Sequence, residues 1–201
     1  MSADPPKITR APMTDDEIRA STVGDLEPLT KPLTFVEYDP AWPALFEREN
    51  TRIRAVLGDR VIRLEHTGST SVPGLAAKPV IDMTMLVADV NDEDAYARDL
   101  EAAGYVIRIR EREPTWYDHR MFMGPDTNVH LHVFSEGCVE IERMVGFRNW
   151  LRTHPEDREL YEATKRELIK REWKYGQNYA DAKTAVVEAI NARAGLPGGH
   201  P

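Results

Sequence analysis

The side chains best suited to chemistry gather in one short stretch of the chain, residues 66–82. A Gly-Ser pair that leaves a strand lets the backbone approach a phosphate closely, and backbone N–H groups and the serine hydroxyl can then donate to its oxygens. Lys78 adds a positive charge in the same stretch. We therefore predict a phosphate-binding loop made of Gly68, Ser69, Thr70 and Ser71, with His66 beside it and Lys78 as a charge-neutralising group.

Asp82 is the candidate metal ligand of this stretch. It lies early in an apolar strand, between Ile81 and Met83, where a carboxylate has no packing role. A single acidic residue at a sheet end is a common metal-binding carboxylate. A Gly-Ser-Thr-Ser run alone is more typical of an ordinary loop. The order of strand, loop and strand-borne aspartate favours a site for phosphate and metal instead.

Two histidines on a later predicted strand could complete this site. His130 and His132 are two residues apart, so they point to one face, while the apolar residues that alternate with them point to the other. We hypothesise that His132, and on weaker grounds His130, binds a metal together with Asp82. The alternative is that both histidines form hydrogen bonds in a polar cleft without touching a metal. A zinc site of these three residues lacks the close ligand spacing typical of zinc motifs.

Basic side chains elsewhere are further candidates for phosphate. Five basic residues surround Trp116 and Tyr117, and the loop 111–118 is either a substrate-binding flap or an exposed charged hairpin whose acidic residues offset its charge. In the C-terminal helices, basic side chains that face the Gly-Ser loop would bind a triphosphate, although most helix lysines are only solvated. The candidates from these two regions are Arg120, Arg148, Lys165 and Lys183.

Alternation and helical spacing predict the elements that must position these residues. Strands are expected over residues 33–38, 61–65, 80–87, 105–109, 119–123 and 129–134. Helices are expected over residues 42–57, 91–103, 140–152, 155–171 and 178–194. The pattern indicates an α+β fold, with a mixed sheet of about five strands, flanking helices and a helical C-terminal third.

The two ends of the chain differ from its middle. Residues 1–32 hold five prolines and many polar residues, which predicts an extended or disordered arm. Within that arm, Thr14 and Glu17 could form a capping box for one short helical turn. One folded domain is expected over residues 33–194, followed by a flexible tail over residues 195–201.

The composition excludes several classes of function. With 34 acidic and 26 basic residues, the formal net charge is −8, which argues against a nucleic-acid partner because binding phosphate backbones needs clustered Lys and Arg. No apolar run approaches the roughly 20 residues that span a membrane, and the N-terminus lacks the apolar core of a signal peptide. The single cysteine, Cys138, rules out an internal disulfide framework, so we expect a cytoplasmic protein.

The order of Gly-Ser loop and strand-borne carboxylate resembles the signature of the DNA polymerase beta-like nucleotidyltransferase superfamily. One branch is much closer, the GrpB family, which the following runs resemble: Tyr38–Pro43, His66–Asp82, His130–Val133, Phe147–Arg152 and Tyr179–Ile190. The resemblance covers residues 33–194. It implies a nucleotidyltransferase fold, Mg²⁺ or Mn²⁺ as cofactor, an NTP and a small-molecule acceptor. The superfamily usually has Asp-x-Asp or Asp-x-Glu, whereas this chain has Thr84 in place of the second carboxylate, which weakens a two-metal site.

The leading hypothesis is a nucleotidyltransferase, or a related phosphoryl-transfer enzyme, that acts on a small molecule. In it, Gly68 and Ser69 hold the nucleotide phosphates, Asp82 binds the metal and Lys78 neutralises developing charge. Two alternatives stay open. One is a non-catalytic nucleotide- or metabolite-binding module that kept the loop and lost a metal carboxylate. The other is a metal-dependent hydrolase built on Asp82, His130 and His132.

Overall fold

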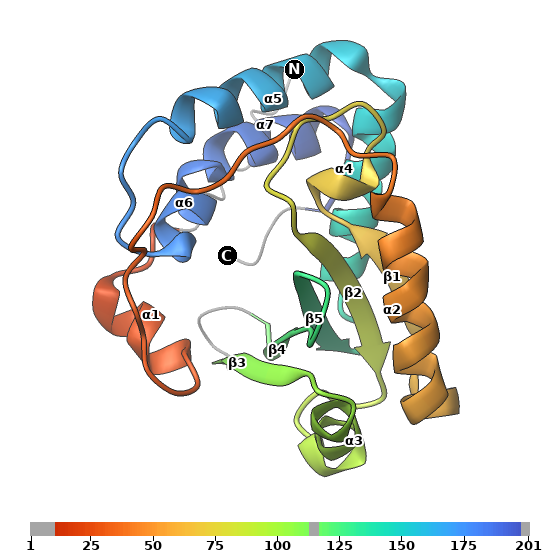
Figure 1. The fold of residues 1–201 in the computed structure, drawn as a ribbon. Helices are drawn as coiled ribbons and strands as arrows, with labels where there is room; N and C mark the ends of the chain where they lie inside the picture. The colour runs from red at the N-terminus through yellow and green to blue at the C-terminus, as the bar shows by residue number, and fades with distance from the viewer. Residues whose placement is uncertain (1–10, 113–116, 198–201) are drawn as a thin grey trace, which may run out of the picture.

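The protein is built around one mixed five-stranded sheet. The computed structural model describes residues 11–112 and 117–197 (Figure 1). The strands are β1 (Arg63–Thr67), β2 (Ile81–Val87), β3 (Val106–Glu111), β4 (His119–Met123) and β5 (Val129–Ser135). Their order in the sheet is β1-β2-β5-β4-β3, and among these strands only β2 and β5 pair in parallel. The α+β class and the mixed sheet predicted from the sequence are confirmed.

The strand expected over residues 33–38 does not form. Val36 makes a single antiparallel bridge with Ala77, in which each backbone N–H donates to the other residue's carbonyl at 2.9 Å. Ala77 lies in the turn-rich segment before β2, so within the described part of the chain residues 33–38 have no regular strand beside them. Phe35 instead lies against helix α5 (Pro155–Leu168), with its ring centroid 5.3 Å from the Lys165 ammonium. The prediction was wrong because a strand needs a partner as well as a suitable pattern.

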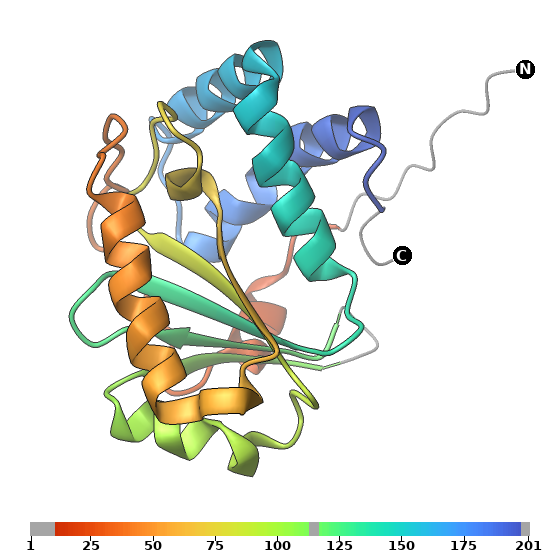
Figure 2. The ribbon, with the colours of Figure 1, turned by 90° about the vertical axis from the view of Figure 1, so that its right-hand side faces the viewer.

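Alternation along the strands gives the sheet two different faces. One face carries apolar side chains such as Met83, Met85 and Leu131, which form the main core with helices α2 (Trp42–Leu57) and α3 (Ala97–Ala102). The other face lies under the C-terminal helices, as Figure 2 shows. Polar strand residues that alternate with the core positions therefore point toward those helices.

The C-terminal third is helical, as predicted. Its helices are α4 (Glu140–Thr153), α5 (Pro155–Leu168), α6 (Gly176–Ala182) and α7 (Thr184–Arg193). The single helix expected over residues 178–194 is two helices that meet at Lys183, and α7 packs against both α4 and α5. The helix expected over residues 91–103 is likewise a 3-10 turn (Glu93–Ala95) followed by α3. Among the described residues, no helix has the length and apolar character needed to cross a membrane.

The N-terminal helix α1 (Asp15–Ser21) lies against the outer edge of the sheet (Figure 1). Thr14 and Glu17 form the predicted capping box at its start. The Val23 N–H donates to the Arg108 carbonyl of β3 at 2.8 Å, so this segment pairs with an edge strand that would otherwise expose backbone groups. Residues 1–10 and 198–201, parts of the expected arm and tail, lie outside the described residues.

Candidate functional site

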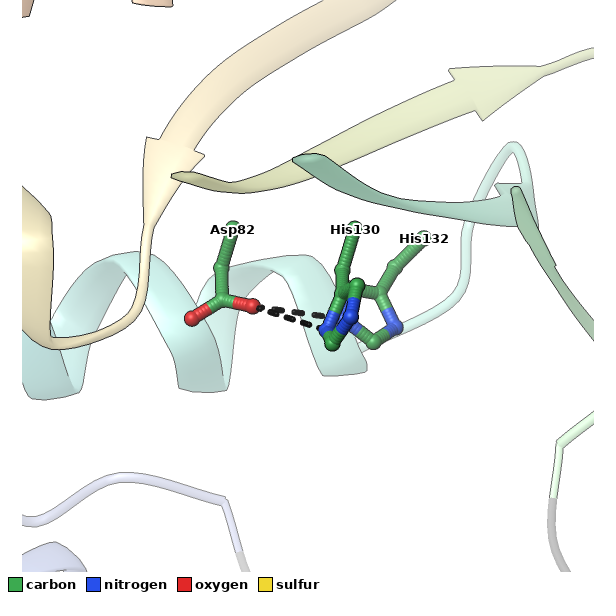
Figure 3. A group of neighbouring side chains, drawn as sticks. All are labelled: Asp82, His130 and His132. Atoms are coloured by element: carbon green, nitrogen blue, oxygen red, sulfur yellow. Dashed lines mark ion pairs between the residues drawn. The ribbon is translucent and has the colours of Figure 1, made fainter. Parts of the chain in front are cut away.

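Asp82, His130 and His132 lie side by side on the helix-covered face of the sheet (Figure 3). Strands β2 and β5 are parallel neighbours whose register pairs Asp82 with His130 and Thr84 with His132. Asp82 Oδ1 lies 3.6 Å from His130 Nδ1 and 3.9 Å from His132 Nε2. One potential ligand atom from each residue falls within 4.8 Å of the other two. The register of the two strands thus brings together the three residues that we expected to share a site.

Gly68 lies directly against the Asp82 side chain. Its backbone has φ +65°, and a Cβ atom added there would lie 2.8 Å from the Cβ of Asp82 and closer still to its Oδ2. Only glycine satisfies both the backbone conformation and the contact. Burial raises the pKa of Asp82, but the neighbouring His132, His130 and Lys78 outweigh it and lower the pKa below its usual value. The carboxylate is therefore available in its charged form to bind a cation.

A cavity of about 490 Å³ lies beside this cluster, within the range of small-molecule sites. Its walls come from all five strands of the sheet, the Gly-Ser loop and the helices α4 to α7. Part of the predicted site lines it: Gly68, Ser69, Lys78, Asp82, His130, His132, Lys165 and Lys183. Residues from three distant parts of the sequence therefore share one cavity.

Three lysines line this cavity, and none has a carboxylate at ion-pair distance among the described residues. Lys165 Nζ donates to the Ser69 hydroxyl at 3.0 Å and to a loop carbonyl at 2.7 Å. Lys78 Nζ and Lys183 Nζ each lie 4.9 Å from the ring centroid of Tyr179. Within the described part of the chain, none of the three forms an ion pair. We refer to Lys78, Lys165 and Lys183 as the lysine cluster.

Burial changes the charge state of the lysine cluster. Desolvation lowers the pKa of Lys165 to about 7 and that of Lys78 to about 8, and the nearby Lys183 lowers both. Desolvation also lowers the pKa of Lys183. A bound anion would offset this cost, because an opposite charge favours the protonated form of each amine. The cluster is therefore suited to binding phosphate.

Helices α4 and α7 add buried polar atoms to the cavity wall. Glu140 Oε2 lies 3.1 Å from Arg143 Nε, within ion-pair distance but without hydrogen-bond geometry. Desolvation raises the pKa of Glu140 to about 7. Asn191 Oδ1 is buried and, among the described residues, has no hydrogen-bond partner. Buried polar atoms of this kind are normally satisfied, so a polar ligand would complete this part of the wall. Sequence reasoning missed Glu140 and Asn191, since both resemble ordinary helix-surface residues.

His119 connects His132 to a second carboxylate. His119 Nε2 lies 3.0 Å from His132 Nδ1, and His119 Nδ1 lies 2.8 Å from Glu111 Oε2. From the sequence, neither His119 nor Glu111 was given a place in this site. Alternation along β4 could have identified this contact, because it puts His119 on the same face of the sheet as His132.

Four predicted phosphate ligands lie away from the cavity: His66, Thr70, Ser71 and Arg148. The His66 ring stacks on Phe46 with centroids 4.9 Å apart, and burial lowers its pKa to about 4. The hydroxyls of Thr70 and Ser71 donate to the carbonyls of Val80 and Gly68 at 2.9 and 2.6 Å. Arg148 Nη1 donates to the His66 carbonyl at 2.8 Å. These contacts hold the loop in shape.

Arg120 also lies outside the cavity, because alternation on β4 turns it to the opposite face of the sheet. It is fully buried, and its Nε and Nη2 donate to the side chains of Glu93 at 2.6 Å and Asn91 at 2.8 Å. The flap expected over residues 111–118 is only partly described, since residues 113–116, with Trp116, lie outside the described residues.

Thr84 stands at the second carboxylate position of the superfamily pattern, yet it does not line the cavity. It is fully buried, and its Oγ1 lies 2.9 Å from Thr67 Oγ1 and 3.1 Å from the sulfur of Met144 in α4. Helix α4 therefore covers this position. The cluster keeps a single carboxylate, that of Asp82, as the sequence indicated.

Comparison with known proteins places this chain among relatives of similar length. Residues 32–193 match the GrpB protein family. A UPF0157 protein of Halalkalibacterium halodurans is 53% identical over 183 residues, which cover 91% of this chain and 93% of the relative. A crystal structure of the conserved protein GrpB from Enterococcus faecalis covers 80% of this chain and 96% of its own, with a TM-score of 0.69 and 32% identity.

A dephospho-CoA kinase of Mycolicibacterium paratuberculosis is 31% identical over 166 residues, which cover 70% of this chain but only 40% of the kinase. The likeness to that kinase is thus confined to part of its length. The match that spans residues 32–193 extends over the sheet, the Gly-Ser loop and the C-terminal helices alike. The chain therefore belongs to the GrpB family.

Proposed function

We propose that this protein is a metal-dependent nucleotidyltransferase, or a closely related phosphoryl-transfer enzyme. It binds an NTP in the 490 Å³ cavity and transfers a nucleotidyl or phosphoryl group to a small-molecule acceptor. The observation that carries this proposal is the position of the lysine cluster, whose three amines form no ion pair among the described residues and share a cavity with Asp82, His130 and His132.

The lysine cluster supports phosphate binding on energetic grounds. A desolvated ammonium group without an ion-pair partner is costly, and the lowered pKa values of Lys165 and Lys78 express that cost. A polyphosphate brings several negative charges and many acceptor oxygens, so it would pair with all three amines at once. Gly68 and Ser69 line the same cavity and would place backbone N–H groups and one hydroxyl near the phosphate chain.

The Asp82 cluster supports a divalent cation beside the phosphates. One carboxylate and two imidazoles supply three ligands, which leaves positions for water or a phosphate oxygen. When bound, such an ion would neutralise charge on phosphate oxygens and help to align them for transfer. The family resemblance implies Mg²⁺ or Mn²⁺. With Thr84 buried under α4, the residues fit one ion rather than the pair that many phosphoryl-transfer enzymes use.

The predicted site residues divide into two roles in this proposal. Those that line the cavity act directly: Gly68 and Ser69 hold phosphate, and Lys78, Lys165 and Lys183 neutralise its charge. The residues outside the cavity act by fixing the loop. Among these, Ser71 bonds to the Gly68 carbonyl, and Arg148 bonds to the backbone at the end of β1. We therefore expect substitutions in the second group to change stability more than ligand affinity.

One observation favours an alternative. The loss of the second carboxylate at Thr84 fits a nucleotide- or metabolite-binding module without catalysis, because a single cation stabilises a phosphoryl-transfer transition state less than a pair does. The imidazole ligands of the cluster would likewise suit a metal-dependent hydrolase. These readings differ in turnover and in metal requirement, and the experiment below separates them.

The test is thermal unfolding of the purified protein with ATP, GTP, CTP or UTP, each with and without Mg²⁺ or Mn²⁺. We compare the wild type with Asp82→Ala and with Asp99→Ala, which removes an aspartate from a surface ion pair with Arg60. A nucleotide at about 100 times its dissociation constant should add roughly 2.7 kcal/mol of stability. The proposal expects a metal-dependent shift that Asp82→Ala abolishes and Asp99→Ala keeps.

The nucleotide that stabilises the protein is then incubated with candidate acceptors, and pyrophosphate release is measured. Release in the wild type and none in Asp82→Ala would support transfer. A nucleotide shift that is independent of metal, with no pyrophosphate release, would favour the binding module. Absence of a shift with every nucleotide, in a folded sample, would refute nucleotide binding, and metal-dependent hydrolysis of phosphate esters would then be measured.

A further inference from the structure

Two buried titratable side chains behind the Asp82 cluster have no part in the proposed function, His119 and Glu111. His119 is almost fully buried, and its ring stacks on His132 and on Phe134 with centroids 5.2 and 4.7 Å away. Both of its ring nitrogens are engaged, one by Glu111 at 2.8 Å and one by His132 at 3.0 Å. The four groups Glu111, His119, His132 and Asp82 therefore form a continuous chain from the interior to the cavity.

In the state that binds a metal, Glu111 is ionised and both histidines are neutral, and this chain of contacts then has one consistent arrangement of protons. A carboxylate accepts, so His119 Nδ1 carries the proton that it donates to Glu111. His119 Nε2 is then an acceptor, and it receives the Nδ1 proton of His132. The lone pair of His132 is left on Nε2, the nitrogen that lies 3.9 Å from Asp82 Oδ1. The hydrogen bonds thus turn a metal-binding lone pair toward the cluster, as outer-shell partners of metal-bound histidines do.

The spacing of the ligand atoms matches a small ion. With metal–ligand bonds of about 2.0–2.1 Å, two ligands in tetrahedral geometry lie about 3.4 Å apart. The distances from Asp82 Oδ1 to His130 Nδ1 and His132 Nε2 are 3.6 and 3.9 Å, so shifts of a few tenths of an ångström would bring each nitrogen to the spacing from Asp82 that a shared ion requires. Mg²⁺ prefers oxygen ligands and keeps several waters, whereas imidazole suits Fe²⁺, Ni²⁺, Cu²⁺ and Zn²⁺.

We propose that Asp82, His130 and His132 form a one-ion centre for a nitrogen-binding transition ion, and that Glu111 and His119 are positioning residues that orient His132. The inference rests on the proposed function, because it names the ion and the supporting residues of the same site. It departs from the Mg²⁺ or Mn²⁺ that the family resemblance implies. The reason is the donor set of this chain, in which two of three ligands are nitrogens.

The test is titration calorimetry of metal-free full-length protein with Zn²⁺, Co²⁺, Mn²⁺ and Mg²⁺, together with the visible absorption spectrum of the Co²⁺ form. One Zn²⁺ or Co²⁺ should bind per chain, more tightly than Mn²⁺ and much more tightly than Mg²⁺. Asp82→Ala should abolish this binding. The control variant His154→Ala removes a histidine that stacks on Trp150 and is not part of the cluster. This variant should bind Zn²⁺ and Co²⁺ as the wild type does.

The positioning role is tested with two substitutions of one residue. His119→Phe keeps a ring for stacking and removes the hydrogen bonds, so Zn²⁺ affinity should fall about 10–100-fold and the Co²⁺ spectrum should change. His119→Gln offers an amide oxygen that can accept the His132 proton, so it should recover most of the affinity and the spectrum. If His119→Phe does not fold, Glu111→Gln is measured in its place, and its Zn²⁺ affinity should also fall, but by less.

Two results would overturn this inference. One is that no transition ion binds at one per chain, or that Mg²⁺ binds as tightly as Zn²⁺. The other is that a folded His119→Phe, or Glu111→Gln in its place, binds Zn²⁺ with wild-type affinity and spectrum. Zn²⁺ binding that follows these expectations, in a protein that no nucleotide stabilises, would refute the proposed function while leaving the metal centre intact.

Discussion

Raising the pH should weaken anion binding in the cavity, because the lysine cluster loses its charge close to neutrality. Sulfate is the probe, since its own charge stays constant over the range and any change in affinity comes from the protein. The anion binds the protonated amines and raises their pKa in the complex, so the bound state holds more protons than the free state above pH 7. Affinity must then fall as the pH rises.

The size of the effect follows from the pKa values of the free protein. Lys165 has a pKa of about 7 and Lys78 of about 8. At pH 9, about one in a hundred Lys165 side chains and one in ten Lys78 side chains are charged. If both are charged in the complex, sulfate affinity falls about a thousand-fold between pH 6 and pH 9, or about 4 kcal/mol.

Titration calorimetry at a series of pH values measures this dependence, and Lys165→Met is the matched variant. This substitution removes the lysine that contributes the larger part of the pH dependence. The sulfate affinity of the variant should therefore be lower than that of the wild type at pH 6 and should fall only about ten-fold by pH 9. Wild-type affinity that does not change with pH would refute the reasoning. So would a Lys165→Met variant with the pH dependence of the wild type.

Three other substitutions test the architecture around the site. Gly68→Ala should destabilise the fold by about 1–3 kcal/mol in urea unfolding and should weaken Zn²⁺ binding, because the added Cβ would collide with Asp82. Unchanged Zn²⁺ affinity would contradict the collision. Thr84→Asp should lower the free energy of unfolding by about 3–5 kcal/mol in the same assay, because helix α4 buries the position. The variant should still bind one ion per chain, and a second bound ion would show that position 84 can reach the cavity. Arg120→Met should lower the free energy of unfolding by about 3–5 kcal/mol, because Arg120 makes buried hydrogen bonds to Glu93 and Asn91. Sulfate binding to the folded protein should stay unchanged, and weaker sulfate binding would place Arg120 in the site.

Much of the site could be predicted from short runs of sequence. The Gly-Ser loop and Asp82 stand 14 residues apart at most, so their proximity follows from one loop and one strand. His130 and His132 alternate with core residues, and alternation alone puts them on one face. The helix over residues 42–57 and the capping box at Thr14 also follow from local spacing, because their hydrogen bonds join residues three or four apart.

Other features depended on which segments become neighbours. Residues 33–38 have a strand-like pattern but lie beside a turn-rich segment, so they form one bridge instead of a strand. Arg120 and Arg148 were both predicted to bind phosphate because they are basic. Arg120 instead lies on the far face of the sheet, and Arg148 donates to the backbone carbonyl of His66. The charge of a side chain does not reveal its partner, because the partner comes from another part of the chain.

The sequence by itself indicated the family, through the resemblance of its Gly-Ser segment and other runs. It also indicated the elements of the mixed sheet and the residues able to do chemistry, because loop type, strand alternation and helix spacing are local properties. Only the tertiary structure decided which of these residues meet. The parallel pairing of β2 with β5 places Asp82 beside the two histidines, and the packing of the C-terminal helices brings Lys165 and Lys183 to the cavity that the Gly-Ser loop lines. The lowered pKa values of those lysines likewise arise from burial, which exists only once distant elements have packed together.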